Sequence, residues 1–113
     1  MRVKAYGRAA AMAALAVCVS SVSLAAGSET IVDAEALAIV QKHCVACHAA
    51  KPTHPAFDKP PNGVTLETIT DLKTYASRVY AQTVQNTAMP LGNQTHMTDD
   101  ERAALGRWLK ASP

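Results

Sequence analysis

Apolar residues recur at helical spacing in three stretches of this chain. The stretches cover residues 33–46, residues 70–86 and a C-terminal segment that begins at Thr98. Residues three or four positions apart lie on one face of an α-helix, so each stretch is expected to bury one face. The pattern predicts an all-α domain with three main helices. The apolar faces comprise Ala36, Ile39, Val40 and His43, then Leu72, Ala76, Val79 and Thr83, then Leu105, Trp108 and Leu109.

Polar residues mark where these helices should begin. Asp33 is a suitable N-cap for the first helix, and either Thr68 or Thr70 could cap the second. Thr98, followed three residues later by Glu101, is a capping box, the clearest start signal in the chain. The two terminal helices are therefore expected to pack on each other.

A short motif lies where the first helix should end. Residues 44–48 read CVACH, and a Cys-x-x-Cys-His sequence is typical of covalent haem c attachment. Both thiols would become thioethers, and the adjacent imidazole would bind the iron. A zinc site would need two more ligands, and no second cysteine pair exists. A thioredoxin-like pair would need a βαβ context, which the helical pattern does not offer.

The N-terminus has the pattern of a secretory signal peptide. Three basic residues precede an apolar stretch at 9–19, and small residues follow up to Ala26. Cleavage is expected after Ala25, with Ala26 as the alternative, so residues 1–25 would be the signal and 26–113 the domain. An uncleaved anchor is the other interpretation, although the apolar run is short for a membrane span. Export suits the motif, because haem c is attached outside the cytoplasm.

Removing the signal changes the composition. Lys plus Arg falls from 11 to 8 against 9 Asp plus Glu, so the net charge changes from +2 to −1. No basic tract is present, which argues against a nucleic-acid partner. Cys18 leaves with the signal, so the only remaining cysteines are those of the motif. A domain of this size has a marginal core, which a covalently held haem would stabilise.

Residues 49–66 show neither helical nor strand periodicity. Four prolines and Gly63 interrupt the stretch, and a structureless segment of this length is usually functional. We expect it to wrap the haem, with Phe57 packed on the ring and the carbonyl of Pro60 or Pro61 accepting a hydrogen bond from His48. A mobile surface loop is the simpler alternative.

Met89 is the candidate for the second axial ligand. A thioether opposite histidine raises the reduction potential of haem iron. Met89 lies 41 residues after His48 and directly before a proline, which would stiffen the loop that carries the sulfur. Met97 is a rival that looks like a packing residue, and His54 or His96 could instead give bis-histidine ligation.

These features resemble a class I c-type cytochrome. The resemblance rests on the CVACH motif, on Ala-Met-Pro at 88–90 and on the capped C-terminal helix, and it covers roughly residues 30–111. It implies a small cytochrome c-like domain around one covalent haem c. By this resemblance Cys44 and Cys47 attach the haem, and His48 and Met89 are the axial ligands.

A narrower likeness concerns the segments 44–57, 80–85, 89–93 and 97–102. They are similar to the C-terminal cytochrome c domain of bacterial membrane-bound urate oxidases. In that family a multi-helix membrane domain precedes the cytochrome and is thought to oxidise urate. We expect this chain to be the cytochrome module alone. His96 stands where that family usually carries a glycine.

Two functions follow as hypotheses. The first is a periplasmic electron carrier, not itself an enzyme, between a dehydrogenase or urate oxidase and a terminal oxidase or another cytochrome. It would touch membranes only through partners or an uncleaved signal, and a monomer is the default. The second is a haem peroxidase or gas sensor, with His54 or His96 beside an open or displaceable sixth position. Lys42, Lys51, Lys59 and Lys73 could steer an acidic partner or be ordinary surface.

Overall fold

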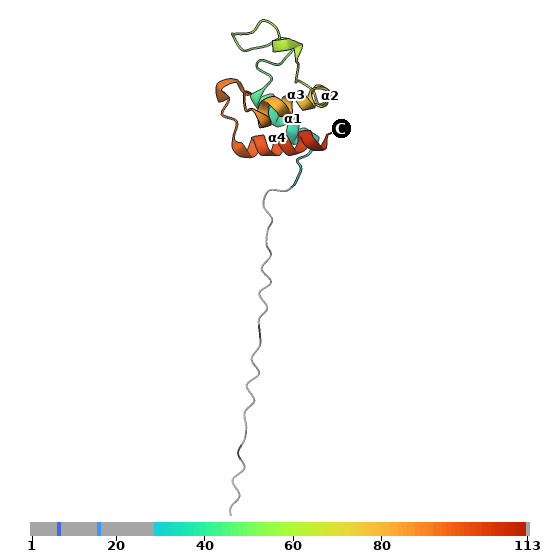
Figure 1. The fold of residues 1–113 in the computed structure, drawn as a ribbon, viewed down its shortest axis with the longest axis vertical. Coiled ribbons are helices and arrows are strands. Elements are labelled where there is room, and N and C mark those ends of the chain that lie inside the picture. Colours follow the sequence, from blue (N-terminus) through green and yellow to red (C-terminus); the bar gives the residue numbers. More distant parts are fainter. Residues whose placement is uncertain (1–6, 8–15, 17–28, 113) are drawn as a thin grey trace, which may run out of the picture.

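The computed structural model describes residues 29–112 and the isolated residues Gly7 and Ala16. The expected signal peptide, including Cys18, otherwise lies outside these described residues. Every regular element within them is helical, which confirms the predicted all-α class (Figure 1). The α-helices are α1 (Asp33–His43), α2 (Ile69–Thr74), α3 (Ala76–Tyr80) and α4 (Asp99–Ala111), with a π-helical turn at Ala81–Gln85 and 3-10 turns at Pro61–Gly63 and Leu91–Asn93.

The start of α1 differs from the prediction. Its N-cap is Val32, whose backbone N–H donates to the Glu35 carboxylate at 3.1 Å. Asp33 is therefore the first residue of the helix and does not cap it. Its carboxylate instead accepts a hydrogen bond from Trp108 Nε1 at 3.0 Å, which joins α1 to α4. The Asp33 side chain, which the local pattern assigned to capping, is thus used in a tertiary contact instead.

The capping box of α4 is confirmed. Thr98 Oγ1 accepts from the Glu101 N–H at 3.1 Å, and the Glu101 carboxylate accepts from the Thr98 N–H at 2.9 Å. Leu105, Trp108 and Leu109 are buried, as their spacing predicts. The two residues of the capping box, Thr98 and Glu101, are only three positions apart, so the sequence alone was enough to predict it.

The terminal helices pack on each other and form the core, as predicted. The core draws apolar side chains from both helices, from α2 and α3 and from the loop segments between them. Met97 is buried in it, which confirms its interpretation as a packing residue. The buried cluster consists of Ala36, Val40, Cys44, Leu66, Leu72, Val79, Met97, Leu105, Trp108 and Leu109.

The second predicted helix is not continuous. Thr68 caps α2 by accepting from the Asp71 N–H at 3.1 Å, and the helix ends at Thr74. Tyr75 then has φ −101° and ψ 12°, and α3 starts after this bend. The apolar face predicted for this segment is still buried at Leu72, which has no exposed surface. The bend leaves α2 packed on α1 and turns the next segment toward the cavity described below.

Residues 49–66 lack periodic structure apart from the turn Pro61–Gly63, as predicted. In Figure 1 this loop, in green, lies on the opposite side of the molecule from α4. Backbone hydrogen bonds tie it to the CVACH motif, because Leu66 N–H donates to His48 O at 2.8 Å and His54 N–H donates to Ala46 O at 2.9 Å. Among the described residues, no helix is both long and apolar enough to cross a membrane.

Candidate functional site

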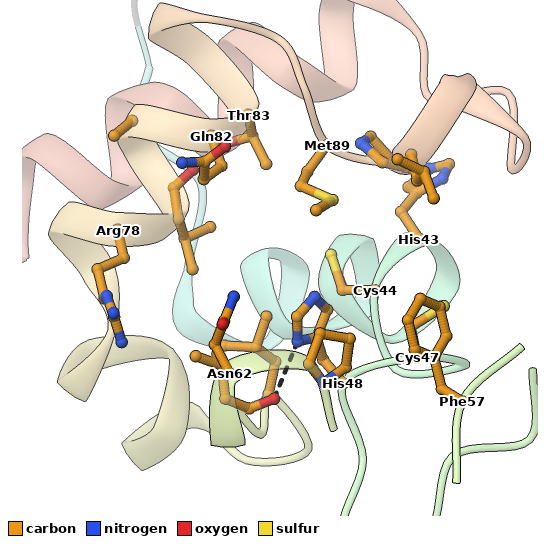
Figure 2. A pocket seen from close by; sticks show the side chains of 17 residues that line it. His43, Cys44, Cys47, His48, Phe57, Asn62, Arg78, Gln82, Thr83 and Met89 are labelled. Carbon is orange, nitrogen blue, oxygen red and sulfur yellow. Dashed lines mark hydrogen bonds between the residues drawn. The ribbon is translucent and has the colours of Figure 1, made fainter. Parts of the chain in front are cut away.

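A cavity of about 550 Å³ lies between the end of α1, the loop 49–66 and the segment that runs from α3 to Pro90. This volume is in the range of cofactor sites, roughly 300–1,000 Å³. All four residues singled out from the sequence line it, namely Cys44, Cys47, His48 and Met89 (Figure 2). Phe57 also lines it, as expected for a residue that packs on a flat ring.

A tight turn presents the motif. The first helix was predicted to reach Ala46, but α1 ends at His43, and Cys44 leaves the helical conformation at φ −123°. The N–H groups of Cys47 and His48 both donate to Cys44 O, at 3.2 Å and 2.9 Å. The turn brings both thiols and the imidazole to one wall of the cavity.

The His48 ring is held by a backbone carbonyl. Its Nδ1 lies 2.9 Å from Val64 O, and a carbonyl only accepts, so Nδ1 carries a proton and donates; in the neutral ring the lone pair is then on Nε2. The predicted partner, Pro60 or Pro61, was wrong. Their carbonyls accept from Gly63 and Val64 N–H at 3.0 Å and 3.1 Å within the 3-10 turn, which leaves the Val64 carbonyl for His48.

The surroundings of the two cysteines favour the neutral thiol form. Burial, with a smaller contribution from Cys47, raises the pKa of Cys44 to about 12, and burial also raises the pKa of Cys47. They follow the C-terminus of α1, where the helix dipole disfavours a thiolate. A thioredoxin-like pair needs the opposite environment, one that lowers the pKa of its reactive thiol. In the described part of the chain, no three His, Cys, Asp or Glu side chains gather to hold a metal ion, which also argues against zinc.

Met89 faces the motif from the other side of the cavity. Figure 2 shows its side chain directed into the space opposite Cys44 and His48. None of the three rival ligands lines this cavity. Met97 is buried in the core, while His96 is exposed and has φ 57°, a left-handed conformation that glycine adopts readily.

Three polar cavity residues were not found from the sequence. Arg78, Gln82 and Asn62 line the cavity, and Figure 2 shows Arg78 and Asn62 away from Cys47. Arg78 and Gln82 are four positions apart, so the sequence alone indicated that they share one helical face. The sequence could not show that this face meets the cavity.

His43 lines the cavity as well and connects three segments. Its side chain has no exposed surface, with Nδ1 2.8 Å from Thr95 Oγ1 and Nε2 2.9 Å from the Glu101 carboxylate. A hydrogen bond from Lys42 and then one from the Thr98 backbone hold the pKa of Glu101 near 2, well below its usual 4.5. The ionised carboxylate only accepts, so His43 Nε2 donates.

The four lysines considered for steering do not line the cavity. Lys42 forms an ion pair with Glu101 at 2.8 Å, and Lys73 forms one with Asp33 at 3.1 Å. Both partners of the Lys73–Asp33 pair are exposed, and such a pair contributes little to stability. Both pairs fit the interpretation of these lysines as ordinary surface.

The donor set of the cavity fits a haem c. Two thiols lie beside an imidazole whose Nε2 is free, a thioether faces them, and the wall between is mostly apolar, with Phe57, Leu66 and Val79. Such a wall suits a flat macrocycle, and Arg78 supplies a positive charge at the cavity for carboxylate substituents.

Comparison with known proteins agrees with this chemistry. A family model described as Cytochrome c matches residues 34–113, which include the whole motif, Met89 and α4. A search of curated proteins and a search of solved structures each found no match.

Proposed function

Because this chain belongs to the cytochrome c family, whose members bind haem c covalently, we propose that it carries single electrons. Members of the family are typically electron carriers and not enzymes. Cys44 and Cys47 would hold the haem through thioethers. When bound, haem iron supplies a one-electron couple whose potential depends on the axial ligands and on burial.

The observation that carries the proposal is the placement of His48 and Met89 on opposite sides of one apolar cavity. We assign them as the two axial ligands. The Val64 carbonyl fixes the His48 ring and leaves Nε2 as the ligand atom. With both axial positions filled by this chain, no substrate would reach the metal, as an electron carrier requires.

The visible spectrum of the oxidised holoprotein tests the Met89 assignment. Wild type should show the weak long-wavelength sulfur-to-iron band, and Met89→Leu should lack it. Met97→Leu is the matched control, since Met97 lies in the core and the band should remain. Absence of the band in wild type, or rapid carbon monoxide binding to the reduced protein, would contradict the assignment.

A haem peroxidase or gas sensor was the alternative. It needs a catalytic side chain beside an open sixth position, and neither His54 nor His96 lines the cavity. His43 does line it, but both of its ring nitrogens are engaged. No observation favours this alternative. Peroxide turnover by wild type that disappears in His96→Ala would support the peroxidase hypothesis.

The location and partners are also part of the proposal. The N-terminal pattern supports export to the periplasm, so holoprotein from that compartment should begin at Ala26, or at Gly27 for the alternative cleavage site. The likeness to urate oxidase cytochrome domains suggests a urate oxidase as one electron donor, with another dehydrogenase as the alternative. Reduction of the oxidised protein by urate-oxidising membranes with urate, and not without it, is the expected result.

A further inference from the structure

The segment that carries Met89 leaves a helix in an unusual way. The N–H of Asn86 donates to Ala81 O at 3.1 Å, a π-type bond, and the chain then turns away at Thr87 with φ 53°. A helix that ends leaves its last carbonyls without helical partners. One of them, Gln82 O, accepts from the Met89 N–H at 2.9 Å. The Met89 loop is thus folded back on the helix that precedes it.

A side chain from α4 completes this arrangement. Arg102 Nη1 donates to Met89 O at 2.8 Å and also to Thr83 O. A terminal guanidinium nitrogen carries two hydrogens, so one Nη1 can serve both carbonyls. Arg102 is half-buried, and its charge lies at the C-terminal end of the α3 and π-helical segment, where a cation is favourable.

We propose that Arg102 is a positioning residue for Met89. By holding the carbonyls of Thr83 and Met89 together, it fixes both ends of the loop that presents the thioether to the cavity. The inference rests on the proposed function in one respect, the assignment of Met89 as an axial ligand. Bonds from a charged donor are stronger than neutral ones, and the planar guanidinium loses less freedom in forming them than lysine would.

Arg107 offers a matched control on the same helix. Its Nε donates to Glu29 O at 3.3 Å, and it does not line the cavity. Arg102→Met and Arg107→Met therefore remove the same charge and donors from α4 and keep a similar apolar stem. Only the first removes bonds to the Met89 loop.

Imidazole titration of the oxidised holoprotein measures how readily Met89 is displaced. The apparent affinity rises with the fraction of molecules in which the sulfur has left the iron. Two bonds from a charged donor predict imidazole binding that is about ten- to a hundredfold tighter in Arg102→Met. Arg107→Met should stay within about twofold of wild type, and its change in urea midpoint calibrates any general loss of stability.

Amide hydrogen exchange at Met89 in the holoprotein gives a second readout that does not require sulfur ligation. Exchange should accelerate at least about tenfold in Arg102→Met and remain unchanged in Arg107→Met. Unchanged exchange in Arg102→Met, or equal acceleration in both variants, would overturn the proposal. Accelerated exchange combined with a wild type that lacks the sulfur-to-iron band would uphold the positioning of the loop and reject the ligand assignment.

Arg102→Lys keeps the test decisive if Arg102→Met does not fold. Lysine retains the charge but presents one compact ammonium on a shorter reach, so it should recover only part of the effect. We expect imidazole affinity at least about threefold above wild type. Wild-type imidazole affinity together with wild-type exchange at Met89 would overturn the proposal.

Discussion

The two walls of the cavity are built differently. On one wall, a single turn after α1 carries Cys44, Cys47 and His48, and the partner of His48 is Val64, 16 residues away. On the other wall, Met89 is held by the Gln82 carbonyl and by a guanidinium that reaches across from α4.

This difference separates local from tertiary control. The His48 wall depends on a short turn and one loop, so it should form wherever that loop closes. The Met89 wall needs α4 docked in place before Arg102 can reach it. We therefore expect the histidine side to be the more robust, and sulfur ligation to be the first feature lost when the tertiary contacts weaken.

The largest effect should come from breaking the His48 wall. Loss of a residue that hydrogen-bonds a metal ligand typically lowers metal affinity by about 10- to 100-fold. Loss of the ligand itself should therefore have at least as large an effect, and we expect His48→Ala to lower the yield of covalent holoprotein at least about tenfold. Haem content per polypeptide, from absorbance and intact mass, measures this. His54→Ala is the control because His54 does not line the cavity, and an equal loss there would contradict the assignment.

A smaller effect is expected at Glu101, which joins α1 to α4 through His43 and takes part in the capping box of α4. Its pKa is lowered from 4.5 to about 2 in the folded protein, so its stabilisation is complete above pH 4.5 and is lost as the pH falls toward 2. Glu101→Gln should lower the free energy of unfolding by about 1 to 3 kcal/mol at pH 7, with little difference left near pH 2.

Urea titrations followed by circular dichroism at both pH values check this expectation. Asp100→Asn is the control, since Asp100 is an exposed acid in the same first turn of α4. A stability difference between wild type and Glu101→Gln that stays constant from pH 7 to pH 2 would show that the carboxylate charge is not its source.

The smallest effect should follow from Thr95→Val. The change keeps the size of the side chain and removes the hydroxyl that lies 2.8 Å from His43 Nδ1. A neutral hydrogen bond contributes about 1 kcal/mol, which shifts the thermal midpoint by roughly 4–8 °C in a domain of this size. Thr53→Val, at an exposed loop position, should leave the midpoint unchanged. A midpoint equal to wild type in Thr95→Val would indicate that this link does not stabilise the fold.

Local signals predicted much of this structure correctly. The capping box at Thr98 and the spacing of Leu105, Trp108 and Leu109 define α4, because both act within a few residues along the chain. The irregular loop also follows from its prolines. The CVACH motif indicated the chemistry, because two thiols and an imidazole at this spacing meet in one turn.

Predictions failed where residues far apart in the sequence determined the conformation or the hydrogen-bond partner. Asp33 was expected to cap α1, but its carboxylate is bonded to Trp108, 75 residues away. The second helix was expected to be continuous, yet it bends at Tyr75 and ends in a π-helical turn as its buried face passes from α1 to the cavity. No pattern in the sequence distinguishes these outcomes, because each depends on which elements pack together.

The sequence by itself determined the class of fold, the likeness to the cytochrome c family and four of the residues that line the cavity, namely Cys44, Cys47, His48 and Met89. These follow from motifs and periodicities that act over short distances. Tertiary structure alone decided which carbonyl holds His48, that His43 joins Thr95 to Glu101, and that Arg102 holds the Met89 loop. Hydrogen bonds require their partners within about 3 Å, and only the packed chain brings residues so far apart in sequence to that distance.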